Sequence, residues 1–163
     1  TNALIEPKKK FTDFPKILGI DGVKKRKKSL KNDIEIAATA EETTARVMQM
    51  VTDPARIRRS DPGNPDICNV FSMHKIFSSK EEVDMVNVEC RRAGIGCVDC
   101  KKLLAANMNA YFAPLRERRR VFEKDPDGTW DMLREGARKA QVLAEETMTD
   151  VRKAVGLPPA SKK

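Results

Sequence analysis

Four cysteines lie in the central part of the chain, at Cys68, Cys90, Cys97 and Cys100, with the spacing C-x21-C-x6-C-x2-C. The last pair follows a Gly-Ile-Gly sequence at a predicted helix start. A helix N-terminus lowers the pKa of a thiol and directs backbone N–H groups toward sulfur. The pattern predicts a four-thiolate metal site. The simpler alternatives are four buried apolar side chains or two disulfides.

Spacing alone leaves the metal open between zinc and a [4Fe–4S] cluster. Structural zinc usually has two short ligand pairs, whereas this chain has one C-x2-C pair. A [4Fe–4S] cluster takes four cysteines in a larger cage, which suits separate ligands. Basic residues flank the cysteines and would offset the negative charge of either centre: Arg91, Arg92, Lys101 and Lys102.

A second group of residues with possible chemistry is the basic run Lys24-Lys-Arg-Lys-Lys28. Prolines and glycines punctuate the sequence up to about residue 33, which predicts a loop-rich segment. By itself such a run fits an exposed basic stretch or a patch of the nuclear-localisation type.

Composition limits the class of protein that these residues serve. The chain has 163 residues with 32 Lys and Arg against 24 Asp and Glu, a net charge of +8. That excess of positive charge favours a polyanionic partner. Only 5% of the residues are aromatic, which favours helices over a β-sandwich. No uncharged apolar run approaches the roughly 20 residues of a membrane span, and no signal-peptide pattern is present.

Hydrophobic periodicity predicts the helices that position both groups. Thr39 and Glu42 form a capping-box pattern, Ser79 is a predicted N-cap, and Thr129 is expected to cap the last helix. The predicted helices cover residues 40–52, about three turns after residue 65, 79–90, 99–120 and 129–155. The fold class expected is mostly α.

Several strings together resemble the bacterial-type tryptophanyl-tRNA synthetases, which are class I enzymes, over nearly the whole chain. The most specific are Val51-Thr-Asp-Pro-Ala-Arg-Ile-Arg-Arg-Ser-Asp-Pro-Gly-Asn-Pro65 and Ala93-Gly-Ile-Gly-Cys-Val-Asp-Cys-Lys-Lys-Leu-Leu104. Pro114-Leu-Arg-Glu-Arg118 and the closing helix from Gly136 to Leu157 also fit. The resemblance implies a helical anticodon-binding domain preceded by the loop-rich end of a Rossmann catalytic domain.

The resemblance also implies a role for the basic run. Gly19-Ile-Asp-Gly22 and Ser29-Leu-Lys-Asn32 flank a divergent form of the mobile KMSKS loop, which closes over ATP in that family. Lys25, Lys28 and Ser29 match the motif and are the expected catalytic residues at the ATP phosphates. Arg26 and Lys27 replace the usual Met and Ser, and the loop carries one extra residue.

For the cysteines, the resemblance favours iron and sulfur. A subset of the family carries C-x22-C-x6-C-x2-C and binds a [4Fe–4S] cluster beside the anticodon site. The present first spacing is one residue shorter and the other two are identical. A [4Fe–4S] cluster is therefore expected at these four cysteines, with zinc as the alternative.

The expected domains are residues 1–35 as a catalytic-domain remnant, 36–157 as the anticodon-binding domain and 158–163 as a flexible tail. The expected function is part of a tryptophan–tRNA ligase that uses ATP with Mg²⁺, tryptophan and tRNA. The family implies a cytoplasmic homodimer. This chain alone is expected to be inactive, because no HIGH-type motif is present. The alternative is a non-catalytic RNA-binding or metal-stabilised interaction module.

Single-stranded anticodon bases are recognised through their edges and by stacking, while Lys and Arg hold the phosphates. A solvated helix face is the simpler explanation for each basic candidate. The single histidine, His74, is expected to be packed or at the surface rather than a ligand. The candidate tRNA contacts are Arg91, Arg92, Lys101, Lys102, Arg134, Arg138 and Lys139.

Overall fold

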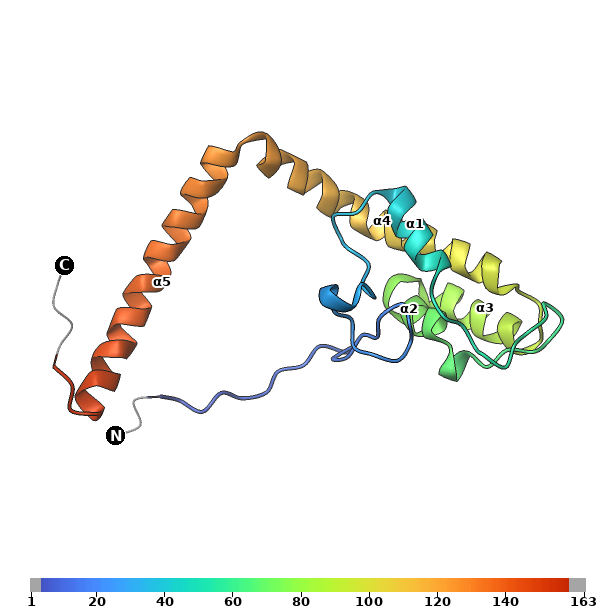
Figure 1. The fold of residues 1–163 in the computed structure, drawn as a ribbon, viewed down its shortest axis with the longest axis horizontal. Helices are drawn as coiled ribbons and strands as arrows, with labels where there is room; N and C mark the ends of the chain where they lie inside the picture. Colours follow the sequence, from blue (N-terminus) through green and yellow to red (C-terminus); the bar gives the residue numbers. More distant parts are fainter. Residues whose placement is uncertain (1–3, 159–163) are drawn as a thin grey trace. The chain divides into compact units, whose positions relative to one another are not determined.

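The computed structural model describes residues 4–158, and these are mostly helical, as predicted (Figure 1). The only β pairing among them is an isolated bridge between Leu18 and Lys25. No helix in this range is long and apolar enough to cross a membrane. The elements are η1 (Lys28–Leu30), α1 (Ala40–Met48), η2 (Pro65–Ile67), α2 (Asn69–Phe77), α3 (Lys80–Arg91), α4 (Cys97–Lys124) and α5 (Pro126–Ala154).

The chain divides into two compact units. The larger, which we call the helical unit, is Thr12–Arg118. It contains the helices α1 to α3, most of α4, and the segment 19–32 around the basic run Lys24–Lys28, which we call the basic loop. The smaller, the terminal unit, combines the residues up to Phe11 with those from Arg119 onward, including α5.

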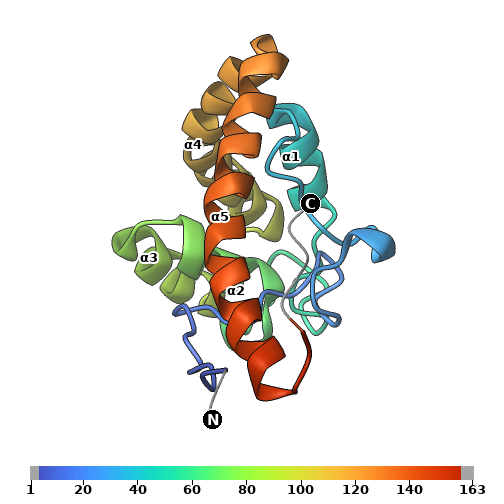
Figure 2. The same ribbon diagram turned by 90° about the vertical axis from the view of Figure 1, so that its left-hand side faces the viewer.

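The core of the helical unit is built from one face of each of its four α-helices. Helices α2 and α3 lie side by side in both ribbon views (Figures 1 and 2). Full burial of one side chain of the size of Leu104 or Met108 stabilises the fold by about 1.5–3 kcal/mol. The buried apolar side chains from the helices and their ends are Val47, Met50, Val70, Phe71, Met73, Val86, Cys100, Leu104, Ala105, Met108 and Phe112.

The predicted helix starts at Thr39 and Ser79 are confirmed. Thr39 Oγ1 accepts from the Glu42 amide at 3.2 Å, and the Glu42 carboxylate accepts from the Thr39 amide at 2.8 Å. Ser79 and Glu82 make the same reciprocal pair. Each box satisfies two amides that the helix itself leaves unpaired.

The start of the last helix differs from the prediction. Thr129 does not cap it, because Asp125 accepts from the Gly128 amide at 2.9 Å and Pro126 occupies the first helical turn. Proline suits that turn because its missing N–H would have no helical partner there. The Thr129 hydroxyl instead donates to the Asp125 carbonyl at 2.8 Å.

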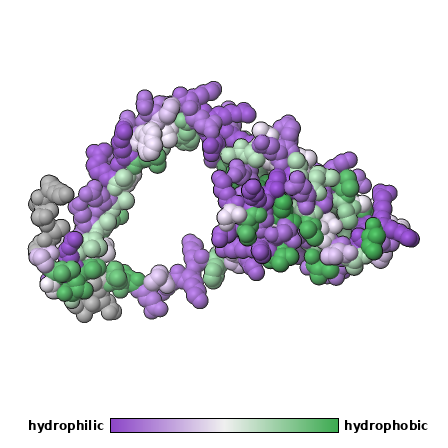
Figure 3. All heavy atoms as spheres, viewed as in Figure 1, coloured by the Kyte–Doolittle hydropathy of each residue, from purple (hydrophilic) through white to green (hydrophobic). Residues whose placement is uncertain are grey.

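Helix α5 ends where glycine was expected to end it. Gly156 has φ +73°, and the Leu157 amide donates to the Arg152 carbonyl at 2.9 Å. This is a Schellman ending. None of its residues is buried, and Trp130 is 59% exposed. Hydrophobic colour runs along one side of this helix (Figure 3).

Candidate functional site

Three helix ends bring the four cysteines of the helical unit together. Cys68 is the N-cap of α2, Cys90 lies in the last turn of α3, and Cys97 and Cys100 lie in the first turn of α4. Cys100 is buried and the other three are half-buried. Burial, with smaller contributions from the other three thiols, raises the pKa of Cys100 to about 12. The thiols are therefore close enough to interact electrostatically.

Arg56 is the cation beside these thiols. Its Nη1 lies 3.9 Å from Cys90 Sγ, and its Nη2 donates to the carbonyl of Ile95 at 2.8 Å. Burial raises the pKa of Cys90, while the Arg56 charge acts in the opposite direction. Arg56 was missing from the residues predicted for this site, although it lies in the 51–65 string.

Gly63 leaves the space that Cys90 uses. A Cβ at Gly63 would lie 2.6 Å from Cys90 Sγ, so no larger residue fits without movement. The Gly63 amide also donates to the Cys90 carbonyl at 2.9 Å. The sequence offered no signal for this contact beyond the position of Gly63 in a turn-rich connector.

The donor set is suited to a soft metal centre, because all four donors are thiols. The neighbouring guanidinium group would offset their negative charge. Within residues 4–158, no three His, Cys, Asp or Glu side chains are grouped as ligands of one metal ion. In a [4Fe–4S] cluster each cysteine binds a separate iron atom, so its ligands stand farther apart than those of a single ion. Four neighbouring thiols in this arrangement are chemically compatible with the cluster.

The basic loop precedes α1 in the sequence of the helical unit. Lys25 forms the isolated bridge with Leu18, and Lys28 and Ser29 begin the short helix η1. Lys25, Lys28 and Ser29 are all exposed. Lys28 Nζ lies 3.3 Å from a carboxylate oxygen of Glu35. The predicted catalytic residues thus occupy one short surface segment.

Two polar side chains hold the ends of this loop. Asp21 Oδ1 accepts from the Val23 and Lys24 amides at 3.0 and 3.1 Å. Asn32 is buried, and it donates to Asp21 at 2.8 Å and accepts from the Lys27 amide at 2.8 Å. The Asn32 hydrogen bond is the main cause that holds the pKa of Asp21 below its ordinary value.

The helices fix the loop from outside. Arg46 of α1 donates to the carbonyls of Lys31 and Asp33, the latter at 2.9 Å from Nη2. Arg26, which stands where the resembled motif has Met, reaches to 3.7 Å from Met73 Sδ. Burial lowers the pKa of Arg26. Arg26 therefore fills a packing position and is not displayed to solvent with the lysines.

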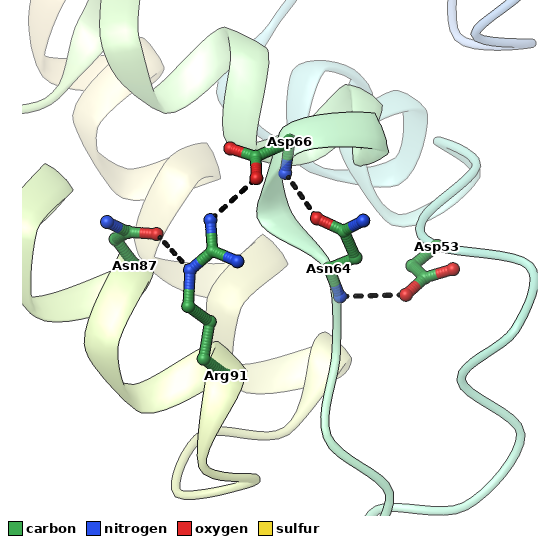
Figure 4. A network of polar contacts seen from close by, with 5 residues as sticks. All are labelled: Asp53, Asn64, Asp66, Asn87 and Arg91. Atoms are coloured by element: carbon green, nitrogen blue, oxygen red, sulfur yellow. Dashed lines mark hydrogen bonds and ion pairs between the residues drawn. The ribbon is translucent and has the colours of Figure 1, made fainter.

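Four of the predicted tRNA contacts lie at the facing ends of α3 and α4. Arg91 donates to Asp66 at 2.7 Å and to Asn87 at 3.0 Å. Figure 4 shows both contacts. Arg92 pairs with Glu89. These arginines are partly neutralised by their acidic neighbours.

The two lysines differ from each other. Lys101 Nζ donates to the Met48 carbonyl at 2.9 Å, which ties α4 to the end of α1. Lys102 is exposed and makes no ion pair with a described residue. Lys102 is thus the member of this group that the structure leaves available to a phosphate.

The other three predicted contacts lie on α5, in the terminal unit. Arg134 pairs with Asp131 at 2.8 Å, and Arg138 and Lys139 both pair with Glu135. All three basic side chains are largely exposed. Exposed pairs of this kind contribute little to stability and exchange readily for another anion.

Comparison with known proteins gives one consistent family. Residues 3–113 match the family described as tRNA synthetases class I (W and Y). The chain is 44% identical over 154 residues to the tryptophan–tRNA ligase of Aquifex aeolicus, covering 94% of this chain and 39% of that protein. It is also 44% identical over 153 residues to the tryptophan–tRNA ligase of Thermotoga maritima, covering 93% and 46%.

A solved structure agrees with these relatives. The tryptophanyl-tRNA synthetase of Campylobacter jejuni, complexed with ADP and tryptophan, superposes with a TM-score of 0.72 at 28% identity. The match covers 87% of this chain and 44% of that one. The chain spans less than half the length of each of these three proteins. Fold, sequence and family match together place this chain in the class I tRNA synthetases of the tryptophan and tyrosine group.

Proposed function

We propose that this chain is part of a tryptophan–tRNA ligase, in which it supplies the ATP loop and the anticodon-binding helices. The observation that carries the proposal is the 44% identity to two ligases of that name over more than nine-tenths of the chain. The exposed Lys25, Lys28 and Ser29 on a loop anchored at both ends support it.

In the proposed reaction, the carboxylate of tryptophan attacks the α-phosphate of ATP and pyrophosphate leaves. Negative charge grows on the leaving group. Lys25 and Lys28 provide positive charge that stabilises it, and the Ser29 hydroxyl donates a hydrogen bond. Mg²⁺, when bound with ATP, would supply further positive charge. The activated tryptophan is then transferred to the 3′ end of tRNA.

The test is tryptophan-dependent exchange of pyrophosphate into ATP, measured on the whole polypeptide that carries this chain. Exchange is expected with tryptophan and not with tyrosine, the other substrate type in the family description. Exchange driven by tyrosine, or none with either amino acid, would overturn the proposal. In the second case tRNA binding without activation would favour an RNA-binding module.

The helices are proposed to bind the anticodon arm of tRNA through a few placed basic residues. Lys102 is the best candidate because it is exposed and has no competing carboxylate among the described residues. Arg91, Arg92, Arg134, Arg138 and Lys139 would exchange their acidic partners for phosphates. Lys101 contributes mainly through its contact with the Met48 carbonyl.

Binding of the 163-residue chain to a tRNA anticodon stem-loop tests this role. Lys102→Ala is expected to weaken binding and to reduce the salt dependence by about one counterion. Lys80→Ala, on the far end of α3 from Cys90, is the matched control and is expected to bind normally. Equal binding by all three chains would contradict a role for Lys102.

At the thiols we propose a [4Fe–4S] cluster held by Cys68, Cys90, Cys97 and Cys100. The support is the all-thiol donor set, the spacing, and the Arg56 guanidinium that offsets negative charge on sulfur. When bound, the cluster would supply a rigid crosslink between the ends of α2, α3 and α4, since anticodon recognition needs no electron. Arg56 would orient Cys90, and Gly63 would leave room for its sulfur.

Anaerobic reconstitution with iron and sulfide, followed by metal and sulfide analysis, tests the metal. Four irons and four sulfides per chain are expected for the wild type, and Cys97→Ser is expected to lose them. Ser60→Ala, an exposed change in the connector, is the control. One zinc per chain and no iron would replace the cluster with the zinc alternative.

Two further parts of the proposal rest on the family alone. The whole enzyme is proposed to be a homodimer that works in the cytoplasm. Analytical ultracentrifugation of the whole polypeptide is expected to give twice the monomer mass. A monomer that is fully active would contradict the dimer.

A further inference from the structure

The histidine of this chain is fully buried, next to the deepest of the four cysteines. His74 has 0% of its surface exposed and lies on α2. Its Nε2 lies 3.1 Å from the carbonyl oxygen of Cys100 and 3.4 Å from Cys100 Sγ. Its Nδ1 lies 2.6 Å from Ser78 Oγ. Both ring nitrogens therefore have polar partners.

The partners decide which nitrogen carries the proton. A carbonyl oxygen only accepts, so Nε2 must be the protonated nitrogen, and its one N–H is shared between the Cys100 carbonyl oxygen and the Cys100 sulfur in a three-centre hydrogen bond. Nδ1 is then bare and accepts from the Ser78 hydroxyl.

A chain of hydrogen bonds carries this arrangement from the core to the surface. Asn107 Nδ2 donates to Ser78 Oγ at 2.9 Å and to Glu82 Oε2 at 2.7 Å. Because the serine oxygen accepts from Asn107, its own proton is directed at His74. The hydrogen bonds from Asn107 to Ser78 and from Ser78 to His74 thus orient the imidazole ring so that its Nε2–H points at Cys100.

We propose that His74 is a positioning residue of the metal centre, whose Nε2–H holds the Cys100 sulfur as a thiolate ligand. The inference rests on the proposed [4Fe–4S] cluster. His74 itself binds no iron, because Nε2 carries the proton that Cys100 O and Sγ share, and Nδ1 accepts from the Ser78 hydroxyl. Such outer contacts fix the orientation of a ligand and change the properties of the metal.

The physical effect is directional. An N–H close to sulfur stabilises negative charge on it, and a reduced cluster carries one more negative charge than an oxidised one. The His74 donor therefore favours the reduced form and makes the reduction potential less negative. It also slows release of Cys100 from iron, since the protein holds the sulfur in place when the bond to iron opens.

The experiment uses the 163-residue chain, loaded anaerobically with iron and sulfide, in four variants beside the wild type. His74→Leu removes the donor. His74→Gln keeps an N–H near the position of Nε2. Ser78→Ala removes the group that orients the ring. Val70→Ala is a control that destabilises the same helix by removing a buried apolar side chain, with no change to any polar group. The readouts are the midpoint reduction potential and the rate of iron loss to a chelator.

His74→Leu is expected to shift the potential to a more negative value and to release iron about tenfold faster. Ser78→Ala is expected to shift both in the same direction by less. His74→Gln should restore most of the wild-type behaviour, and Val70→Ala should leave the potential unchanged.

Two other results distinguish the ways in which the proposal fails. If His74→Leu and Ser78→Ala bind a full cluster with the wild-type potential and iron-loss rate, the role of His74 is wrong and the metal centre stands. If His74→Leu does not fold, the same comparison is made with Ser78→Ala and His74→Gln. A wild-type chain that binds no iron and sulfide overturns the metal centre, and the role of His74 with it.

Discussion

The side-chain amide of Asn69 donates a 2.8 Å hydrogen bond to the carbonyl oxygen of Gly19, which lies 50 positions earlier in the chain. Both residues are buried. The contact joins the turn that opens the basic loop to the first residue of α2, directly after Cys68. The loop and the helix that carries a candidate ligand are therefore parts of one packed structure.

Removal of this contact should destabilise the chain. Asn69→Leu removes one of the two donors to the buried Gly19 carbonyl, which keeps only the Gly22 amide at 3.0 Å. Loss of one such hydrogen bond costs about 0.5–1.5 kcal/mol. Urea unfolding followed by circular dichroism measures the change. Asn87→Ala, which removes only a contact with the exposed Arg91, is the control and should cost less than about 0.5 kcal/mol. Equal losses for both would show that the Asn69 contact is unimportant.

Two glycines make a matched pair. At Gly19 an added Cβ would lie 2.3 Å from Asn32 Nδ2, whereas at Gly136 nothing lies within 4 Å. Gly19→Ala must displace a buried side chain and should cost about 1–3 kcal/mol. Gly136→Ala, inside α5, should stabilise the helix by about 0.5–1 kcal/mol. Thermal unfolding of each variant shows whether its stability falls or rises relative to the wild type. A stabilised Gly19→Ala chain would contradict the close contact between Gly19 and Asn32.

Arg46 is expected to hold the exit of the basic loop. Arg46→Met removes the donors to the Lys31 and Asp33 carbonyls. Local opening then becomes easier, so the amides of Lys27 and Ile20, which bond to Asn32, should exchange hydrogen faster. Hydrogen exchange read by mass spectrometry measures this. Arg59→Met, which removes one long ion pair at the surface, should leave the loop protected.

Substitutions at Lys28 and Glu35 distinguish a role of Lys28 in stability from a role in catalysis. Their ion pair is exposed, so Lys28→Met should change the free energy of unfolding by less than about 0.5 kcal/mol. Loss of a charge that stabilises the transition state should lower pyrophosphate exchange in the whole enzyme by about 10²–10³-fold. Glu35→Gln breaks the same pair but keeps the lysine, so its exchange rate should stay near wild type. A slow Glu35→Gln enzyme with a normal Lys28→Met enzyme would reverse this assignment.

The sequence predicted those features that depend on neighbours along the chain. Thr39 and Ser79 cap helices because a glutamate follows each at the third helical position, which is a local pattern. Gly156 ends α5 for an equally local reason. The prediction of Thr129 as the N-cap was wrong, because Asp125, four residues earlier and followed by Pro126, is a stronger local signal for a helix start.

Features that depend on distant neighbours were not predictable. Lys101 stays a predicted tRNA contact, but its hydrogen bond to the Met48 carbonyl, 53 positions earlier, had no signal in the sequence. Arg56 was not singled out, yet it lies beside Cys90, 34 positions later. The hydrophobic periodicity of residues 129–155 predicted helix α5 correctly. Periodicity does not reveal whether the apolar face is covered, and Trp130 is exposed.

By itself, the sequence determined which thiols and lysines are present, where the helices start, and that four cysteines have a metal-ligand type of spacing. These properties follow from residue types and from hydrogen bonds between near neighbours. Only the tertiary structure decided that His74 and Arg56 face the thiols and that Asn69 and Arg46 hold the loop. Those contacts form because packing the helices around one apolar core brings distant polar groups together, and each buried group must then find a partner.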